Sequence, residues 1–495
     1  MVLGEVLYLI NYQRNENELL ETFLDGVVFN ERRNYTSPKF DLSTAQIGRF
    51  PTVSEGVGIE LIVRPECNQH CDYCYIAQFG HELYPMKYRV NNETILSNLR
   101  SLLDYVYNKK KIFIPRWELF AGDLFYDDLY YDILDVFYDI VKPLYQTYHH
   151  LFTNGNGISI LTPSNCSFIA DDAKVAKFEE YFNRMESIGC HLVLSYSTDG
   201  KYATDIREHH DVSDEFYDKA FAFLKKYGYG PHPMISAESI DNYIQNYDWW
   251  MENMPKYSDS NTMPMMLEVR NNNWTPEKID KYEELLHHVV KSQLEFFGSK
   301  EALAKNLFDT SDRMKMGYNM IRILPYSDAD HAARYTCSMQ WLLHITLNDL
   351  SIVPCHRTSY EQFHIGKFTL DDNGNINGVE AKNVAIGIMT HGFRASTIPK
   401  CSGCKYASMC MFGCLGSQYE NSGELFSPID CVCDLMERKI VVLSKEFRDL
   451  GLLDIALEKQ YITQATYDLY MDMCNEKPKE VPWITVIRNN KPLNK

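Results

Sequence analysis

The sequence predicts an α/β protein in which helices cover a parallel sheet. Two observations predict this class. Short apolar runs alternate with amphipathic stretches between residues 57 and 300, and each run is followed by a stretch long enough for a helix. The chain has 495 residues, 45% of them hydrophobic and 23% charged, which indicates a globular protein with a sizeable core and roughly two to four domains.

Six strand–helix units follow one another in this region. The strands are expected at 57–63, 117–120, 149–153, 191–196, 232–238 and 265–270. The helices are expected at about 92–106, 124–145, 172–188, 213–228, 241–254 and from Pro276 onward, with Asn92 and Thr275 capping the first and the last. Units in this order form an incomplete (β/α)6 relative of the TIM barrel, in which active sites lie at the carboxyl ends of the strands.

The charge balance and the lack of targeting signals exclude several classes. Asp and Glu number 67 against 49 Lys and Arg, and this net charge of −18 argues against broad nucleic-acid binding. No apolar run is long enough to span a membrane, and the N-terminus does not read as a signal peptide. We therefore expect a soluble, cytoplasmic protein, in which spaced cysteines usually hold a metal or do redox chemistry.

Eleven of the fourteen cysteines fall into two groups, and Cys166, Cys190 and Cys474 are expected to be buried core residues. The first group, Cys67, Cys71 and Cys74, lies on the loop that leaves the first predicted strand. Three thiolates do not close a four-coordinate zinc shell. A [4Fe–4S] cluster held by three cysteines keeps one iron open for a ligand.

This three-plus-two spacing, with an aromatic residue before the third cysteine, is the signature of radical S-adenosylmethionine (SAM) enzymes, which the chain resembles over about residues 57–300. The resemblance implies that SAM binds the open iron and is cleaved reductively to a 5′-deoxyadenosyl radical. Ala121 and Asp123 replace a Gly and the Glu of the family's Gly-Gly-Glu segment. The resemblance implies SAM contacts at Tyr73, Gly122, Asp123, Thr153, Asn154 and Ser197, with Ser195 as a competitor for the role of Ser197.

The second group lies between residues 337 and 433, where the regular spacing of Cys401, Cys404, Cys410 and Cys414 indicates a metal site. A zinc ribbon is one interpretation. With the flanking cysteines, residues 337–434 also resemble the SPASM domain, which carries auxiliary [4Fe–4S] clusters in some radical SAM enzymes. The resemblance implies one cluster on Cys401, Cys404, Cys410 and Cys433 (or Cys431), and another on Cys337, Cys355 and Cys414 with its last ligand open.

The expected organisation has five parts. They are an N-terminal extension (1–55), the partial barrel (56–300), a linker (301–336), the SPASM domain (337–434) and a helical C-terminal extension (435–495). Leu350 stands where the SPASM family usually has Gly, so we expect a turn of different construction there. Only 66 residues precede Cys67, too few for the leader-binding module that many related maturases carry.

The resemblance implies a peptide or protein substrate and a flavodoxin- or ferredoxin-like electron donor. Our leading hypothesis is a maturase that forms a thioether or carbon–carbon crosslink in a ribosomally made peptide. The alternatives are formylglycine formation on a sulfatase, peptide epimerisation, and an electron-transfer iron–sulfur protein without catalysis. His356 is a weak candidate for the catalytic base, because it follows Cys355 where the sulfatase-modifying enzymes have an acid.

Overall fold

The computed structural model describes residues 16–29, 58–85, 87, 89–120, 122–149, 152, 157–203, 213–258, 266–309, 320–323, 339, 342–392, 398–410 and 413–476. Three residues of the predicted sites lie outside this part of the chain, namely Thr153, Asn154 and Cys337.

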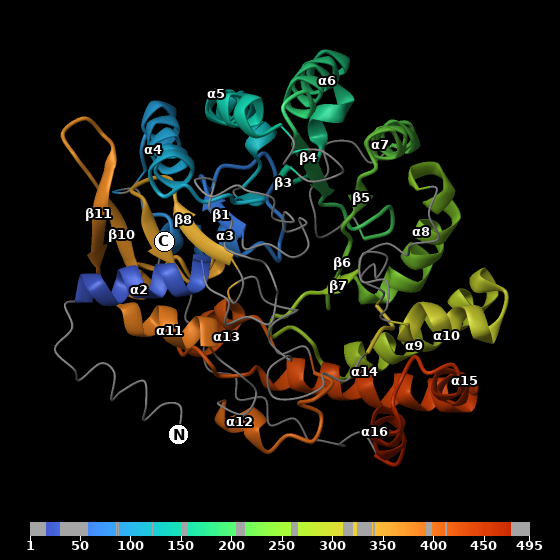
Figure 1. The fold of residues 1–495 in the computed structure, drawn as a ribbon. Helices are drawn as coiled ribbons and strands as arrows, with labels where there is room; N and C mark the ends of the chain where they lie inside the picture. Colours follow the sequence, from blue (N-terminus) through green and yellow to red (C-terminus); the bar gives the residue numbers. More distant parts are fainter. Residues whose placement is uncertain are drawn as a thin grey trace.

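A nine-stranded sheet in the order β11-β10-β9-β8-β1-β2-β3-β4-β5 forms the centre of the molecule (Figure 1). Six neighbouring strands are parallel: β8 (Leu342–Thr346), β1 (Gly58–Ile62), β2 (Arg116–Phe120), β3 (Ile158–Ser164), β4 (Cys190–Tyr196) and β5 (Gly230–Pro231). The antiparallel strands β9 (Ser351–Val353), β10 (Gly366–Leu370) and β11 (Ile376–Ala381) extend one edge. The predicted α/β class is confirmed.

Helices lie outside the arc of strands in Figure 1, as the alternating pattern predicts. They are α4 (Asn92–Asp104), α5 (Leu129–Tyr148), α6 (Asp172–Glu186), α7 (Asp214–Tyr227), α8 (Tyr243–Tyr257), α9 (Pro276–Phe297) and α10 (Lys300–Phe308). Thr275 caps α9 as predicted, because its side chain accepts a hydrogen bond from the amide of Lys278. The cap of α4 is Asn91 instead of Asn92, and it accepts from the amide of Thr94.

One strand of the sheet was missed by the sequence, and the last two expected strands are present. The third strand of the sheet is β3 at 158–164, where the sequence predicted none. Of the strand expected at 149–153, only His149 and Phe152 are described, and neither lies in a strand; Thr153 and Asn154 lie outside the described residues. The last two predicted strands correspond to β6 (Met234–Ile235) and β7 (Leu267–Glu268), which among the described residues form a separate two-stranded ladder.

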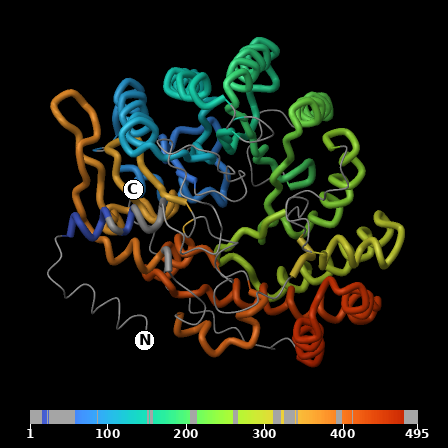
Figure 2. Tube along the Cα trace, viewed as in Figure 1, coloured from blue at the N-terminus to red at the C-terminus, as the bar shows by residue number. Residues whose placement is uncertain are grey.

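The cysteine-rich C-terminal part continues the sheet, since β8 pairs in parallel with β1. The turn between β8 and β9 contains Leu350 with φ of 60°, a left-handed conformation that costs a leucine about 1–2 kcal/mol relative to glycine. Figure 2 shows the N-terminal helix α2 (Glu16–Phe29) beside this part of the chain. It contacts β11 and α11 (Val384–Gly392), and the side-chain oxygen of Asn17 accepts from the amide of Ala381 at 2.9 Å.

Three further helices form the described C-terminal end, namely α14 (Asp430–Asp449), α15 (Leu452–Glu458) and α16 (Gln464–Cys474). Helix α14 lies against α9, and the buried ammonium of Lys439 reaches the buried carboxylate of Glu268 on β7 at 2.5 Å. The predicted tail thus packs on the last strand–helix unit. Among the described helices, none combines the length and the apolar character needed to cross a bilayer.

Candidate functional site

The loop that carries Cys67, Cys71 and Cys74 leaves the carboxyl end of β1 and is fastened to the end of β2. The amide of Gly122 donates to the carbonyl of Arg64 at 2.9 Å, and the amide of Asp123 donates to the carbonyl of Glu66 at 2.8 Å. A Cβ on Gly122 would lie only 2.1 Å from the Glu66 oxygen. Glycine is required here because the two backbones touch.

The three thiols of this loop are all partly buried. The sulfur of Cys67 accepts from the amide of Gln69 at 3.4 Å, and Cys74 precedes α3 (Tyr75–Leu83) as its N-cap. Burial raises the pKa of the Cys67 thiol to about 11, and the nearby Cys74 adds to this rise. Among the described residues no three His, Cys, Asp or Glu side chains converge on one point.

The chemistry of the donor set fits an iron–sulfur cluster. Thiolates are soft ligands, and a bound metal removes the proton that burial otherwise retains on the Cys67 sulfur. The amide of Gln69 already points at that sulfur, as outer-shell donors do in iron–sulfur proteins.

The carboxylate of Asp123 joins the ends of β2 and β3. It is 2% exposed and accepts from the amides of Phe125 at 2.9 Å and Asn165 at 2.8 Å and from the hydroxyl of Ser164 at 3.0 Å. Burial raises its pKa, which these donors partly offset. The side chain of Asp123 is therefore engaged within the protein, as are the amides of Gly122 and Asp123, which donate to the cysteine loop.

Asn165, which sequence reasoning missed, connects this junction to the cysteine loop. Its side chain donates to the amide oxygen of Asn68 at 2.7 Å, and Asn68 donates to the hydroxyl of Ser167 at 2.8 Å. Asn165 directly follows β3, and because no strand was expected at 158–164, the sequence did not mark Asn165 as a residue at a strand end. The signal that could have found it is the polar Ser-Asn pair at the end of the alternating run 158–164.

Tyr73 extends across the strand ends to the loop after β4. Its hydroxyl donates to one carboxylate oxygen of Asp199 at 2.6 Å, and the other oxygen accepts from the amide of Met234 at 3.0 Å. Ser195, near the end of β4, lies with its hydroxyl 3.1 Å from Nδ1 of His232. The amide of Ser197 donates to the carbonyl of Ser164 at 2.7 Å. The structure thus joins the ends of β1, β2, β3 and β4 through residues of the predicted site.

Ionisable side chains form a buried row on one face of three neighbouring strands. Glu60 of β1 stands in register with Glu118 of β2 and with His344 of β8. Although burial raises the pKa of the Glu60 carboxyl, the adjacent His356 brings it below its ordinary value. Burial lowers the pKa of His344 to about 4, so this histidine is neutral at pH 7. Sequence reasoning missed this row, although a Glu within each of two apolar strands was a visible signal.

His356 lies next to this row, beside Glu60. Its ring stacks on Phe120, the last residue of β2, with centroids 3.8 Å apart and planes 8° apart. Its Nδ1 lies 2.8 Å from Oε1 of Glu60. Two directions of contact therefore fix the ring, while its side chain keeps 20% of its surface exposed.

In the second cysteine group, Cys401 lies near three other thiols. The pKa of Cys401 rises to about 12, first through burial and then through the proximity of Cys433, Cys410 and Cys404. Cys431, the alternative to Cys433, points elsewhere: its sulfur lies 3.5 Å from the carbonyl oxygen of Asn271, in the core against α9.

Cys355 and Cys414 lie on two segments that contact each other. Cys355 precedes the short helix η9 (His356–Thr358), and its sulfur accepts from the hydroxyl of Thr358 at 3.3 Å. Cys414 is the N-cap of α13 (Leu415–Ser422). Leu415 packs in one apolar cluster with Cys355, and a Cβ on Gly416 would lie 2.5 Å from Cγ of Arg357. Cys337 cannot be placed beside them, since it lies outside the described residues.

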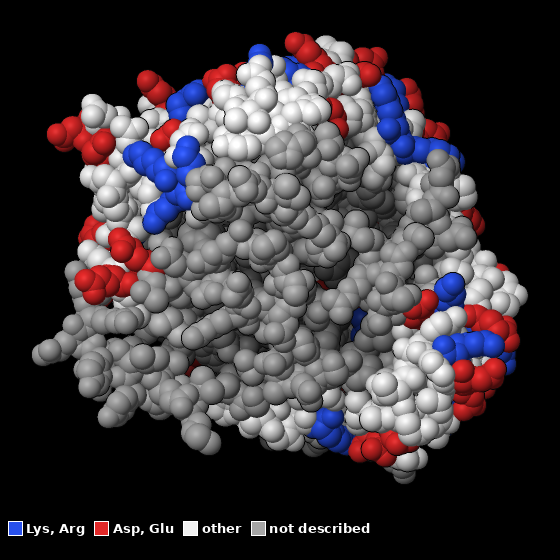
Figure 3. Space-filling model, in the orientation of Figure 1, with Lys and Arg blue, Asp and Glu red and all other residues white. Residues whose placement is uncertain are grey.

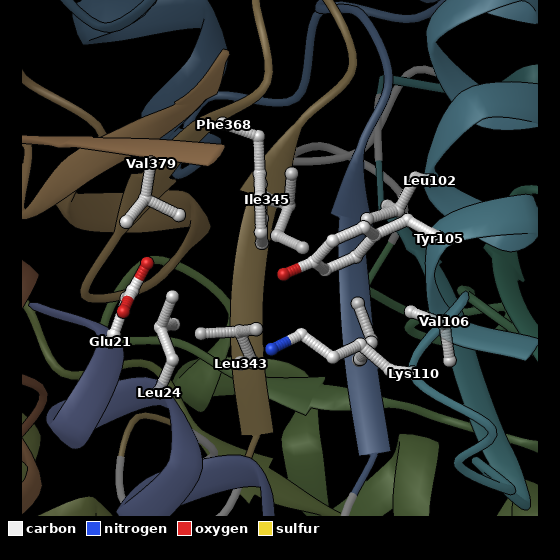
Figure 4. A pocket seen from close by; sticks show the side chains of 11 residues that line it. Glu21, Leu24, Leu102, Tyr105, Val106, Lys110, Leu343, Ile345, Phe368 and Val379 are labelled. Carbon is white, nitrogen blue, oxygen red and sulfur yellow. The ribbon is translucent and has the colours of Figure 1, made fainter. Parts of the chain in front are cut away.

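A small apolar pocket lies on the opposite face of the sheet, away from the cysteines (Figure 4). It is lined by Glu21, Leu24, Ile59, Leu102, Tyr105, Val106, Lys110, Leu343, Ile345, Phe368 and Val379. Ile59 and Leu343 alternate with Glu60 and His344 along their strands, so they point to the other side. This pocket is not part of the candidate site.

Comparison with known proteins finds distant similarity in three-dimensional structure and no match in sequence. No protein-family model matches the chain, and no curated protein matches it in sequence. Native anSMEcpe with bound AdoMet and a Cp18Cys peptide is 14% identical, covers 81% of this chain and 99% of its own, and has a TM-score of 0.48. Streptococcus suis SuiB bound to S-adenosylmethionine is 14% identical, with 87% and 86% covered and a TM-score of 0.39. HydG, a maturase of the [FeFe]-hydrogenase, is 10% identical, with 96% and 90% covered and a TM-score of 0.27.

Proposed function

We propose that this chain is a radical SAM enzyme that modifies a peptide or protein substrate. The observation that carries the proposal is the anchoring of the Cys67/Cys71/Cys74 loop to the end of β2 at the carboxyl edge of a parallel sheet. A three-cysteine cluster there keeps one iron open, at the edge where α/β folds bind their ligands. Two of the similar solved structures hold AdoMet, the ligand that the proposal assigns to this chain.

Cys67, Cys71 and Cys74 would hold a [4Fe–4S] cluster, which with bound SAM would supply the radical chemistry of hydrogen-atom abstraction. The residues of the chain bind and orient. Tyr73, Ser195 and Ser197 line the SAM site, and Gly122 and Asp123 contribute to it through their backbone. The link from Tyr73 to Asp199 supports this, because it fixes the aromatic ring between the ends of β1 and β4.

The fold proposed for this chemistry is a partial (β/α)6 barrel followed by a SPASM domain with auxiliary [4Fe–4S] clusters. One cluster would be held by Cys401, Cys404, Cys410 and Cys433, a set that the proximity of the last three thiols to Cys401 supports. The other would be held by Cys337, Cys355 and Cys414. When bound, these clusters would supply an acceptor for the electron of an oxidative reaction, and a flavodoxin- or ferredoxin-like protein would be the electron donor.

The reaction we propose is an oxidative crosslink, thioether or carbon–carbon, in a ribosomally made peptide. Among the described residues on the rim of the face drawn in Figure 3, acidic and basic side chains are interspersed, so these parts of the rim carry charges of both signs. We therefore assign substrate recognition to residues at the strand ends and not to the net charge of the protein surface.

We propose His356 as the group that receives the proton released from the substrate, and Glu60 as its positioning residue. Glu60 engages Nδ1 and the ring stacks on Phe120, so we assign the proton to Nε2, the ring nitrogen that Glu60 does not engage. His356→Gln is expected to retain SAM cleavage while losing most of the crosslinked product. Glu60→Gln keeps a hydrogen-bonding oxygen and is expected to lose less of the crosslinked product than His356→Gln. Equal amounts of product from wild type and His356→Gln would contradict the role of His356.

The experiment that tests the proposed function is anaerobic turnover of the reconstituted protein with SAM, a reductant and candidate peptides. We expect 5′-deoxyadenosine and a product lighter by two hydrogens, and neither from the Cys67→Ala/Cys71→Ala/Cys74→Ala variant. An unchanged mass with deuterium uptake from solvent would indicate epimerisation instead. Intact clusters without 5′-deoxyadenosine would overturn the enzyme assignment.

A further inference from the structure

Two buried polar side chains on α13 have no hydrogen-bond partner. Ser417 and Gln418 are both 0% exposed. The hydroxyl of Ser417 and both the nitrogen and the oxygen of the Gln418 carboxamide lack a partner. Leaving such groups unpaired costs about 1–3 kcal/mol each, so a native protein keeps them for a reason.

Their position on the helix relates both of them to Cys414. They follow this N-cap cysteine by three and four residues, and side chains at these spacings lie on the same face of a helix. The backbone bond from the amide of Gln418 to the carbonyl of Cys414, at 2.9 Å, shows that the first turn is regular. The carboxamide folds back toward this end of the helix, because its nitrogen lies 3.2 Å from where a Cβ on Gly413 would stand.

The same end of α13 faces the segment that carries Cys355. Leu415 shares an apolar cluster with Cys355, and Gly416 packs against Arg357. The unpaired hydroxyl and amide therefore lie on the face of α13 that follows Cys414, and the first turn of this helix also packs on the segment that carries Cys355, the second cysteine proposed for this cluster. Iron–sulfur clusters offer sulfide and thiolate acceptors, and donors to these sulfurs are a common means of tuning the cluster.

We infer that Ser417 and Gln418 donate hydrogen bonds to the sulfurs of the auxiliary cluster bound by Cys414, and that they raise its reduction potential. The inference rests on the proposed function, which supplies that cluster. The reason for the direction is electrostatic: the reduced cluster carries more negative charge on its sulfurs, and a donor stabilises it more than the oxidised form. The donors thus make this cluster a better acceptor for the electron released from the substrate.

The test is a redox titration followed by EPR, in the Cys67→Ala/Cys71→Ala/Cys74→Ala background so that only auxiliary clusters contribute. We expect Gln418→Leu and Ser417→Ala each to shift the midpoint potential of one cluster to a more negative value, and the double variant to shift it further. Ser417→Ala removes a single oxygen and carries the test by itself should Gln418→Leu not fold.

Ser422→Ala is the matched control. It lies on the same helix, and its hydroxyl already donates to the carbonyl of Gln418 at 2.8 Å, so its removal is expected to leave the potential unchanged. Wild-type potentials in Gln418→Leu and Ser417→Ala, at full iron content, would overturn the inference. Cys414→Ala tests the proposed cluster separately from its hydrogen-bond donors. If this variant keeps all iron and every EPR signal, Cys414 holds no cluster and that part of the proposed function is wrong.

Discussion

Glu66 and Gly122 touch through their backbones, and this contact joins the cysteine loop to the second strand of the sheet. A Cβ on Gly122 would stand 2.1 Å from the carbonyl oxygen of Glu66 and 2.5 Å from that of Pro65. Both neighbours are backbone atoms that two hydrogen bonds hold in place. The position of Cys67 is therefore set by the end of β2 as well as by β1.

Gly122→Ala is expected to push the loop away and to destabilise the protein by about 1–3 kcal/mol, the usual cost of overpacking. It should also lower the iron bound by the Cys67 cluster. Thermal unfolding and iron content measure the two effects. Gly230→Ala is the control, because nothing lies within 4 Å of its Cβ position, and equal behaviour of the two variants would refute the contact.

The bond between Tyr73 and Asp199 spans 126 residues of sequence and joins the cysteine loop to the loop after β4. Tyr73→Phe removes only the hydroxyl, and a hydrogen bond to a charged, buried acceptor contributes about 1.5–3 kcal/mol. We expect a loss of that order in unfolding free energy and weaker SAM binding, measured by calorimetry. Tyr145→Phe, with its ring among aromatic neighbours at the far end of α5, is the control for loss of a tyrosine hydroxyl.

Cys433 and Cys431 lie two residues apart at the start of α14 but face different surroundings. Cys433→Ala is expected to remove on the order of four iron atoms per chain, the content of one [4Fe–4S] cluster. Cys431→Ala should keep all iron, because its sulfur faces Asn271 in the core. Iron and sulfide analysis decides between them, and loss of iron from Cys431→Ala alone would reverse the assignment.

Lys439 and Glu268 hold α14 to β7 by a buried ion pair whose side chains are 5% and 3% exposed. Lys439→Met strands a buried carboxylate, which costs about 3–5 kcal/mol. Burial opposes the charge on Glu268, and Lys439 is the main group that brings its pKa below the ordinary value. The double variant Lys439→Met/Glu268→Gln should recover much of the lost unfolding free energy, because the buried carboxylate is then replaced by a neutral amide.

Arg438, the neighbouring residue of α14, provides a control for this ion pair. Its guanidinium pairs with Asp280 at 3.0 Å and with Glu283, whose side chains keep 64% and 30% of their surface exposed, and pairs open to solvent contribute about 1 kcal/mol or less each. Chemical denaturation of both single variants is the measurement. A loss from Lys439→Met no larger than that from Arg438→Met would show that the tail is not held in this way.

The sequence predicted the elements whose signals are local. Thr275 followed by Pro276 marked the start of α9 because capping depends on neighbouring residues alone. The strand β3 was missed because the resemblance directed the expected strand end to Thr153 and Asn154, which precede it in the sequence. The pairing of β8 with β1, and the row formed by Glu60, Glu118 and His344, depend on strands almost 300 residues apart. Local patterns carry no information about such partners.

His344 makes stability depend on pH. The unfolded chain takes up a proton on this histidine near pH 6.5, whereas burial delays uptake in the folded state until about pH 4. Because the folded pKa is depressed, the unfolded state gains protons first as pH falls, and the folded state loses about 2 kcal/mol between pH 6.5 and 5. The neighbouring Glu60 has a lowered pKa and loses its contribution only at lower pH. Thermal unfolding of the anaerobic protein should therefore show a flatter pH profile for His344→Gln than for wild type. His81→Asn, at a side chain 71% exposed, should keep the wild-type slope, and parallel profiles for all three proteins would show that His344 is protonated normally.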